Sequence, residues 1–563
     1  MRQFITRAES AMIILLACIP LFIHLPYRVN IFLSWEGAYR MSQGQLPFRD
    51  YGTPLGGMYW LIPALFFKVL GAKLFTLIEA QVFINIISGF AFRSILRSLE
   101  LDKGVRFAAV LLFCVSYSFF NFWPWYNHSV IVYELVSLAF LFRGIRPEGG
   151  WAADAVDAGS HRRWLILWMA GAAFFSVCSF FTKQDGGGLA LLIAGAVLFV
   201  YGLLKGRWKP LMLFGAAYVF FLLVFILPML RWGFGYWFNH GQPPHTARVS
   251  LLDISAEFFG ESQWIKFYLF LIVLLVVVRY RKWRDLRADV PGVLLVVLTL
   301  GILAEAAILA VTSYTPPDNN IFFHSFAFAG IFSLLLVLLP AGKLQPRVTV
   351  VLVAGILLWW SGVWWKYTQR LMGPILAGKS KVVSTGENVV NRDTYIIDRD
   401  TTVKDIPTEQ WVECGLPSFR RITLPKPTAE GIHRILDMDL IKQYRERRKT
   451  DAGANLRVLN MSELTPLAAD IPYALERNPQ LPLWYHLGVG MFNRQADTFE
   501  TRIRRQYYDL ILFEYVPTLN NFYPFRTRDS LHANYKQVDS FMAPRRGQTQ
   551  GIIEVFTRPG DSR

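Results

Sequence analysis

The sequence has few cysteines and few charged residues for its length of 563 residues. Its four cysteines form no CxxC pair and three of them lie in apolar runs, so the sequence contains neither a disulfide framework nor a zinc knuckle. Charged residues make up 18% of the chain, whereas an average soluble domain has about 25%. Hydrophobic residues reach 53%. This balance excludes a wholly soluble globular protein, a disordered chain and a fibrous protein.

The apolar residues are concentrated in residues 10–367, in runs of about 17–24 residues that are long enough to cross a bilayer as helices. The runs lack the alternation of a membrane β-barrel. We therefore predict a polytopic α-helical membrane protein, with a transmembrane domain over 1–370 and a soluble domain over 371–563. The eleven predicted spans are 10–27, 73–92, 105–122, 128–143, 164–181, 187–204, 210–230, 264–280, 291–311, 321–340 and 347–365.

The net charge of +17 has two explanations, a nucleic-acid partner or basic loops beside a membrane. Much of the excess stands in short loops between the predicted spans. These basic loops alternate with loops such as 121–127 and 312–320, which contain no Lys or Arg, and the positive-inside rule predicts this alternation. We therefore expect membrane lipids as partners and no nucleic acid.

The run 55–71 decides the orientation of the chain. It is apolar but contains two glycines, Pro63 and Lys68, and counting it as a span would move every basic loop to the outer side. We predict that it is a helix lying in the outer interface. The N-terminus is then cytoplasmic, its first span is retained rather than cleaved, and the domain 371–563 is extracytoplasmic on the plasma (inner) membrane.

Ionisable side chains inside the predicted spans gather near the outer face. Glu79, Glu134, Glu305 and His324 each lie a few residues into a span from that side. A charge in hydrocarbon is costly, so such groups usually face a cavity or one another. The set favours a polar cavity open to the outer side, and the alternative is separate hydrogen bonds between helices.

The first outer loop, 28–72, contains an acidic residue, Glu36, followed by a short amphipathic helix that Gly44 and Pro47 end. A polar turn at 49–51 follows. A carboxylate held at the bilayer surface can act as general base for a sugar hydroxyl. The alternative is a carboxylate that interacts with the N-terminus of its helix, and physical reasoning alone favours this alternative.

Residues 34–60 read SWEGAYRMSQGQLPFRDYGTPLGGMYW. This pattern resembles the first loop of GT-C fold glycosyltransferases, which include protein O-mannosyltransferases and the lipid A aminoarabinose transferase. The resemblance implies eleven to thirteen spans, juxtamembrane helices in the first outer loop and a polyprenyl-phosphate sugar as donor. It also implies catalytic roles for Glu36 and for Asp50, which matches the second acidic position of the loop.

The family's loop lysine is absent here, so another cation has to bind the donor phosphate. Lys183 lies in a Thr-Lys-Gln-Asp-Gly turn that resembles the Thr-Lys-Gly or Lys-Gln turn of related enzymes, and it could neutralise the departing phosphate. Its alternative is a snorkelling lysine. Arg231 and Arg248 are further candidates for phosphate binding.

Other polar residues at the outer ends of the spans are candidates for substrate binding. Related enzymes often place a second functional acid where this chain has 121–129, and His128 or Glu134 would have to replace it. The substrate-binding candidates are His128, Glu134, Gln184, Asp185, Glu305 and His324. No outer loop has an Asp-x-Asp or His-x-x-x-His pattern, so we expect no tightly held metal and no required cofactor. A divalent cation held by Glu36 and Asp50 stays open.

The C-terminal residues predict a small α/β domain, whose expected role is to shape acceptor access or to support the loops. Expected strands are 395–397, 456–459, 509–515 and 552–556, and expected helices are 427–449 and 496–508.

Together these features predict an integral membrane glycosyltransferase. It would move a hexosyl or pentosyl group, with inversion, from a polyprenyl phosphate to an envelope glycan, lipid or protein on the extracytoplasmic face. The alternatives are a lipid-linked sugar flippase or other transporter, and a non-catalytic envelope assembly protein.

Overall fold

A computed structural model gives the structure of the chain. Its described residues divide into two compact units. The helical unit contains Met1–Phe22, Gln81–Pro228 and Ala247–Leu371, and the mixed unit contains Ile23–Ala80, Met229–Thr246 and Met372–Arg563. The structure describes residues 2–28, 31–116, 122–147, 150–151, 159–238, 251–260, 262–312, 322–338, 345–359, 368, 371, 406–451, 453–485, 491, 493–517, 523–545 and 550–560.

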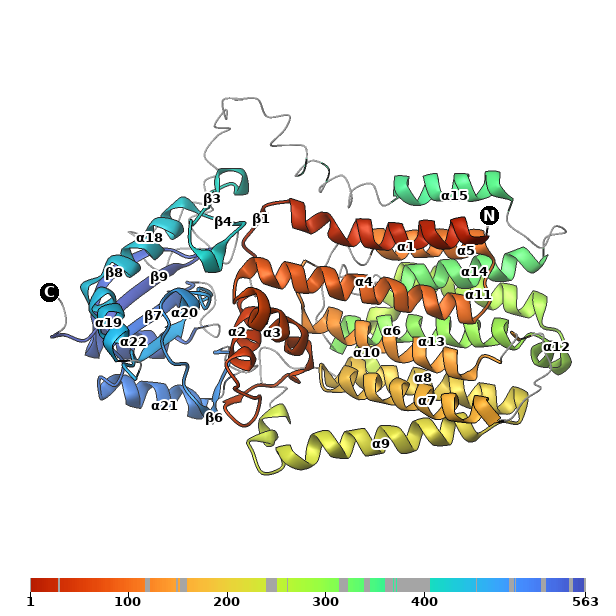
Figure 1. Cartoon of the computed structure of the whole chain (residues 1–563), viewed down its shortest axis with the longest axis horizontal. Coiled ribbons are helices and arrows are strands. Elements are labelled where there is room, and N and C mark those ends of the chain that lie inside the picture. Colours follow the sequence, from red (N-terminus) through yellow and green to blue (C-terminus); the bar gives the residue numbers. More distant parts are fainter. Residues whose placement is uncertain are drawn as a thin grey trace. The chain divides into compact units, whose positions relative to one another are not determined.

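Apolar helices make up the helical unit (Figure 1). Within a bilayer only a helix or a closed barrel satisfies every backbone polar group, so long apolar runs fold as helices. The helices with most or all of their residues in this unit are α1 (Arg2–Cys18), α4 (Leu74–Ser98), α5 (Lys103–Ser116), α6 (Tyr126–Ile145), α7 (Gly159–Phe180), α8 (Gln184–Lys205), α9 (Lys209–Met229), α10 (Leu251–Gly260), α11 (Gln263–Arg279), α12 (Trp283–Ala288), α13 (Val290–Thr312), α14 (Phe323–Leu338) and α15 (Pro346–Trp359).

Each of the eleven predicted spans overlaps one of these helices. Within the described residues, five helices are long and apolar enough to cross a membrane, namely α4, α6, α8, α9 and α13. The bent pair α10–α11 would make a sixth span, and α7, α14 and α15 contain shorter apolar segments. The structure thus confirms a helical protein with several apolar helices, whereas the count of eleven spans and their orientation stay predictions.

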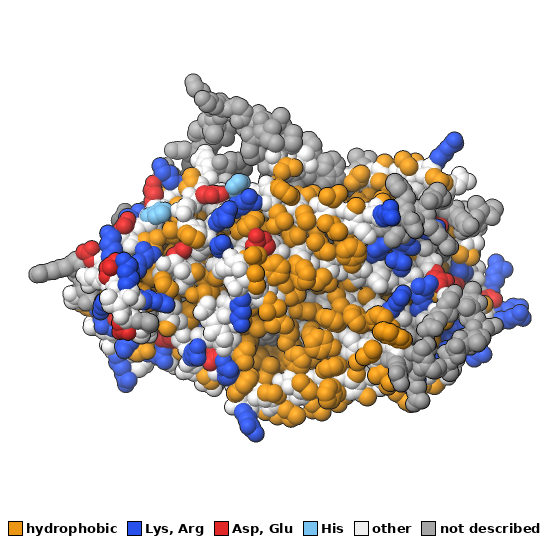
Figure 2. All heavy atoms as spheres, in the orientation of Figure 1, with side chains coloured by type: hydrophobic (Ala, Val, Ile, Leu, Met, Phe, Trp, Pro, Cys, Tyr) orange, Lys and Arg blue, Asp and Glu red, His pale blue; other side chains and the backbone are white. Residues whose placement is uncertain are grey.

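Hydrophobic side chains cover a broad area of the helical unit in Figure 2. Along α9, for example, Met212, Phe220 and Leu227 are each more than half exposed. An exposed apolar face of this extent is unusual for a soluble protein, and it suits contact with lipid.

The run 55–71 forms a short helix, α3 (Met58–Leu70), that begins four residues after Pro54. Its 13 residues fall short of the roughly 20 that a spanning helix needs. It packs on α2 (Ile31–Ser42), where the indole N–H of Trp60 donates to the Leu33 carbonyl at 2.8 Å. A side chain at Gly37 would overlap the Trp60 ring, so a glycine is needed for this close approach.

The mixed unit contains a sheet with the strand order β5-β7-β9-β8. Strand β5 (Val458–Met461) is parallel to β7 (Leu510–Tyr515), and β9 (Ile552–Thr557) runs antiparallel to both β7 and β8 (Lys536–Met542). Every residue of β7 is buried. The helices in the C-terminal segment of the mixed unit are α18 (Lys426–Asp437), α19 (Asp439–Thr450), α20 (Leu467–Asp470), α21 (Asn493–Arg504) and α22 (Phe525–Asn534).

The expected strands 456–459, 509–515 and 552–556 correspond to β5, β7 and β9, and the expected helices correspond to α18, α19 and α21. The expected strand 395–397 lies outside the described residues. Strand β8 was not expected, because most of its residues are exposed at the sheet edge and carry no apolar alternation.

Short strands join the first outer loop to the C-terminal domain inside the mixed unit. Strand β1 (Leu25–Pro26) is parallel to β4 (Ile422–Leu424), which also pairs with β3 (Val412–Glu413), and β2 (Tyr51–Gly52) is parallel to β6 (Asn478–Pro482). The compact units therefore group the loop 28–72 with the C-terminal domain rather than with the helices. Strands of two residues leave no periodic signal in a sequence, which is why the expected division at residue 370 did not include this grouping.

A buried ion pair network joins three helices of the helical unit. The Glu9 carboxylate of α1 accepts hydrogen bonds from the Nε of Arg93 at 2.7 Å and from the Nε of Arg106 at 2.8 Å. Glu9 is fully buried and both arginines are nearly so. Counting basic residues between apolar runs does not detect such a pairing with a residue of another helix.

We expect Glu9→Gln to destabilise the protein by about 3–5 kcal/mol, because it leaves two buried guanidinium groups without a counter-charge. Thermal unfolding in detergent measures the effect. Glu100→Gln is the matched control, since the ion pair of Glu100 with Arg146 is about one-third exposed and should contribute less than about 1 kcal/mol. Equal losses in the two variants would contradict the assigned role of Glu9.

Candidate functional site

Glu36 lies in the middle of α2, whose residues Ile31–Arg40 are all buried. One turn later on the same face, the Nε of Arg40 donates a hydrogen bond to Glu36 Oε1 at 3.0 Å, and its Nη2 lies 2.9 Å from the same oxygen in an ion pair. The first turn of α2 contains no acidic residue. Since the helix dipole acts mainly within the first turn, the structure does not support the alternative in which Glu36 serves the helix N-terminus.

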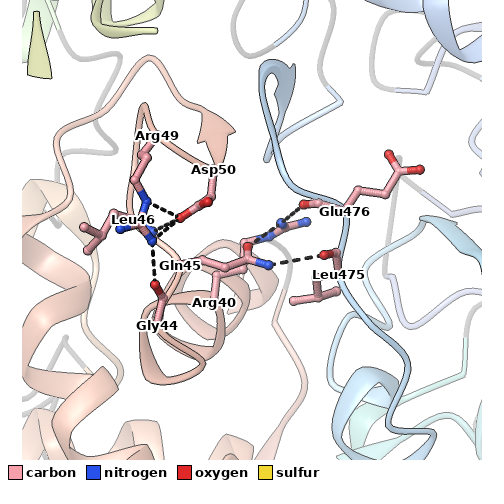
Figure 3. Close-up of polar contacts among 8 residues, drawn as sticks. All are labelled: Arg40, Gly44, Gln45, Leu46, Arg49, Asp50, Leu475 and Glu476. Carbon is pink, nitrogen blue, oxygen red and sulfur yellow. Dashed lines mark hydrogen bonds and ion pairs between the residues drawn. The ribbon is translucent and has the colours of Figure 1, made fainter. Parts of the chain in front are cut away.

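Arg40 also bonds to the C-terminal domain (Figure 3). Its Nη1 donates to the side-chain oxygen of Gln45 at 2.9 Å and to the carbonyl of Glu476 at 2.9 Å. Gln45 in turn donates to the Leu475 carbonyl at 3.2 Å. A single buried guanidinium thus orients Glu36 and holds the segment that follows residue 474.

Burial raises the pKa of Glu36, and the charge and hydrogen bond of Arg40 offset only part of that rise. A general base works best when its pKa lies near the working pH. The environment of Glu36 therefore shifts this carboxyl group in the direction that proton abstraction needs.

Asp50 is engaged in holding the loop (Figure 3). Its Oδ2 accepts hydrogen bonds from the Leu46 backbone N–H at 2.8 Å and from Arg49 at 2.9 and 2.6 Å. Its backbone carbonyl accepts from Asn478 N–H at 2.7 Å. Burial acts to raise the pKa of Asp50, but the hydrogen bonds from Arg49 and Leu46 outweigh it and lower the pKa below its usual value.

A small pocket of about 30 Å³ adjoins Glu36 inside the mixed unit. The first loop supplies Trp35, Glu36, Arg40 and Tyr51 to its wall. The C-terminal domain supplies Val458, Leu459, Asn460, Thr465, Tyr473, Leu475, Glu476, Asn478, Leu481, Pro482, Tyr485 and Phe499.

Sequence reasoning missed Arg40 and the C-terminal wall of this pocket. Glu36 and Arg40 are four residues apart, and in a helix this spacing predicts an ion pair on one face. The C-terminal wall residues stand more than 400 positions away from Glu36, and only the folded chain brings them there.

Lys183 lies in the turn between α7 and α8 of the helical unit. Its Nζ is 3.2 Å from Asp185 Oδ2 and 5.7 Å from the ring centre of Tyr126. Asp185 also accepts hydrogen bonds from the Thr312 hydroxyl and the Gly186 N–H, each at 2.8 Å. The turn therefore joins polar groups from the ends of α6, α8 and α13.

The glycines after this turn serve helix packing in part. A Cβ at Gly187 would overlap the backbone of Phe180, and one at Gly186 would come within 2.8 Å of Val130, whereas Gly188 has open space around it. The contacts of Gly186 and Gly187 therefore indicate close packing against α6 and α7.

Glu134 of α6 and Glu305 of α13 lie close enough to influence each other electrostatically, and each is 1% exposed. His128 Nδ1 lies 3.3 Å from Gln81 Nε2, and His324 Nδ1 lies 2.8 Å from the Tyr268 hydroxyl. The structure therefore pairs the two glutamates and gives each histidine a partner on a neighbouring helix.

The remaining candidates are less informative. Gln184 begins α8 and is partly buried, and Arg231 follows α9 and is exposed. Arg248 lies outside the described residues. Among the residues that the structure describes, no three His, Cys, Asp or Glu side chains are grouped as a metal site would require.

We expect Asp50→Asn to lower the stability of the protein by about 1–2 kcal/mol at neutral pH, because charge-assisted hydrogen bonds are lost. The pKa of Asp50 is lowered in the folded state, so its contribution is present above the unfolded pKa and disappears as the pH falls through the folded one. Thermal unfolding across this acid range should show the variant's deficit shrinking. Asp437→Asn, in an exposed ion pair, is the control, and an equal deficit there would contradict the expectation.

No protein-family model matches the sequence, and its comparison with curated proteins finds no match. Among solved structures, the chain is similar to ArnT from Cupriavidus metallidurans in the apo state, with 12% identity, a TM-score of 0.49, and coverage of 98% of this chain and 97% of that chain. For ArnT bound to undecaprenyl phosphate the identity is 13%, the TM-score 0.47 and the coverage 98% and 97%.

The chain is also similar to a mutant of the arabinofuranosyltransferase AftD from Mycobacteria, with 14% identity, a TM-score of 0.47, and coverage of 99% of this chain and 41% of that chain. At these identities and TM-scores the function has to be inferred from the residues of the chain itself.

Proposed function

We propose that the chain is an integral membrane glycosyltransferase of the GT-C type, which transfers a sugar from a polyprenyl phosphate to a hydroxyl group of an envelope acceptor. The observation that carries this proposal is the buried carboxylate of Glu36, oriented by Arg40 beside a pocket that the first loop and the C-terminal domain line together. A surface carboxylate with a structural role would need neither burial nor such a pocket.

Glu36 acts as the general base in this proposal. It takes the proton of the acceptor hydroxyl while the hydroxyl oxygen bonds to the anomeric carbon. The bond from that carbon to the phosphate oxygen breaks, and polyprenyl phosphate leaves with the electron pair, which inverts the anomeric carbon. The hydrogen bond and the ion pair that Arg40 makes with Glu36 both go to Oε1, so Oε2 is the oxygen proposed to take the proton.

Lys183 is proposed to neutralise the phosphate that leaves. It stands at the N-terminus of the 22-residue helix α8, a position that favours anions because backbone N–H groups point outward there. The phosphate roles of Arg231 and Arg248, and the substrate roles of His128, Glu134, Gln184, Asp185, Glu305 and His324, stay predictions. Asp50 is proposed to position the loop rather than to move protons.

A transporter of lipid-linked sugars is the second candidate. The buried pair Glu134–Glu305 favours it, because facing carboxyl groups inside a helical membrane unit often mark a transport pathway. A transporter would move the substrate without forming a covalent product, and it would not require Glu36.

We expect Glu36→Gln to fold and insert like the wild type but to lose sugar transfer by at least about 100-fold, the usual contribution of a general base. Reconstituted protein is incubated with a panel of polyprenyl-phosphate sugars and crude envelope acceptor, and mass spectrometry follows free polyprenyl phosphate and glycosylated product. Glu446→Gln, at an exposed position of α19, is the matched control. Transfer at the wild-type rate by Glu36→Gln would rule out the base role.

The pH profile gives an independent check. The base must be ionised, so kcat/KM falls as the pH drops through the raised pKa of Glu36. Arg40→Gln removes the charge that lowers this pKa, and the acid limb should therefore move to higher pH. Arg40→Lys keeps a positive charge and should move it less. An unchanged acid limb in Arg40→Gln would contradict the positioning role of Arg40.

A further inference from the structure

Three buried polar groups in the pocket beside Glu36 make no hydrogen bond with any residue that the structure describes. They are the indole Nε1 of Trp35, the hydroxyl of Tyr51 and the hydroxyl of Thr465. The side chains are 0%, 1% and 5% exposed. An unsatisfied buried polar group costs about 1–3 kcal/mol, so native proteins rarely leave several of them in one place.

Other polar groups of the same wall are satisfied. Asn460 donates to the Leu464 carbonyl at 3.1 Å and accepts from the Ser462 hydroxyl at 2.6 Å. Arg40 is committed to Glu36, Gln45 and Glu476. Among the described side chains that line this pocket, the buried polar atoms without a hydrogen bond belong to Trp35, Tyr51 and Thr465.

The chemistry of these groups selects a neutral, hydroxyl-bearing ligand. The Trp35 indole can only donate, and burial raises the pKa of Tyr51, which keeps its hydroxyl protonated. The pocket thus offers three donors beside one carboxylate acceptor. The negative charge of Glu36 would repel an anion such as phosphate. A cation would be repelled by Arg40 and would face the three donor groups.

The number of bonds requires more than one ligand oxygen. A hydroxyl group accepts at most two hydrogen bonds and donates one, so one hydroxyl cannot serve Trp35, Tyr51, Thr465 and Glu36 together. A pocket of about 30 Å³ holds about two water-sized groups. Two neighbouring hydroxyl groups at the edge of a sugar ring fit both conditions, while the ring itself would stay outside.

The pocket is held in shape from both sides. Stacking with Tyr39, at 4.6 Å between ring centres, fixes Trp35 on α2. Thr465 follows a turn that the Asn460–Leu464 hydrogen bond closes between β5 and α20. The bonds of Arg40 and Gln45 to Glu476 and Leu475 hold the wall that follows residue 474 (Figure 3).

We propose that this pocket is an acceptor subsite, in which Trp35, Tyr51 and Thr465 donate to two neighbouring hydroxyl groups of a sugar and Glu36 accepts from one of them. The inference rests on the proposed function, because it uses Glu36 as the base, and it narrows the acceptor to a glycan or glycolipid. Thr465 makes the C-terminal domain a determinant of acceptor specificity.

The test measures binding separately from transfer. Saturation-transfer NMR on the purified full-length chain follows neutral methyl glycosides with neighbouring hydroxyl groups, their deoxy analogues and glycerol phosphate. Binding of the glycosides should weaken about tenfold in Thr465→Val and in Tyr51→Phe, and the deoxy analogues should not distinguish the variants from the wild type. Thr498→Val, exposed on α21, is the matched control.

Stability and kinetics complete the test. Both variants remove a hydroxyl that has no protein partner, so their thermal unfolding should match the wild type. In the transfer assay the KM for acceptor should rise about tenfold, with the KM for the polyprenyl-phosphate donor unchanged.

The acceptor subsite and the transferase activity can fail separately, and the two measurements distinguish these failures. Glycoside binding that depends on Thr465 in a chain that transfers no sugar would support the subsite and reject the transferase. Transfer that needs Glu36 but shows unchanged glycoside binding and acceptor KM in Thr465→Val would overturn the subsite. Binding of glycerol phosphate in preference to the glycosides, or of none of the probes, would overturn it as well.

Discussion

The guanidinium of Arg40 is the interaction on which the candidate site depends. It reaches Glu36 on its own helix, Gln45 in the following loop and the Glu476 carbonyl of the C-terminal domain. Arginine suits this role because its planar group donates several hydrogen bonds in fixed directions. Removal of its charge would leave Glu36 buried and unpaired, so the orientation of the base and the attachment of the pocket wall depend on the same side chain.

The surroundings of the two loop acids are the basis for the different roles proposed for them. Burial dominates at Glu36 and raises its pKa, while the hydrogen bonds from Arg49 and Leu46 dominate at Asp50 and lower its pKa. Carboxyl groups of similar intrinsic acidity thus move in opposite directions. The resemblance to GT-C enzymes assigned both to catalysis, and the contacts favour Glu36 as the base and Asp50 as the residue that holds the loop.

Part of the candidate site could be predicted from local pattern. The loop motif singles out Glu36, Gly44 and Pro47 predict the helix end that the structure places at Ser42, and the end of an apolar run places Lys183 at the start of α8. The pairing of Glu134 with Glu305 and the contacts of Glu9 with Arg93 and Arg106 could not be predicted. They depend on which helix faces touch, and apolar helices in lipid show little periodicity to indicate a face.

Local sequence pattern was enough to predict the helical character of the first two thirds, the short helix near residue 60 and the α/β pattern of the C-terminal part. Hydrophobic run length and strand periodicity can be read from neighbouring residues alone. The grouping of the loop 28–72 with the C-terminal domain, and the position of Thr465, Tyr473 and Tyr485 in the pocket beside Glu36, became visible in the folded chain. Two-residue strands and contacts across more than 400 positions form through packing, and packing is a property of the whole chain.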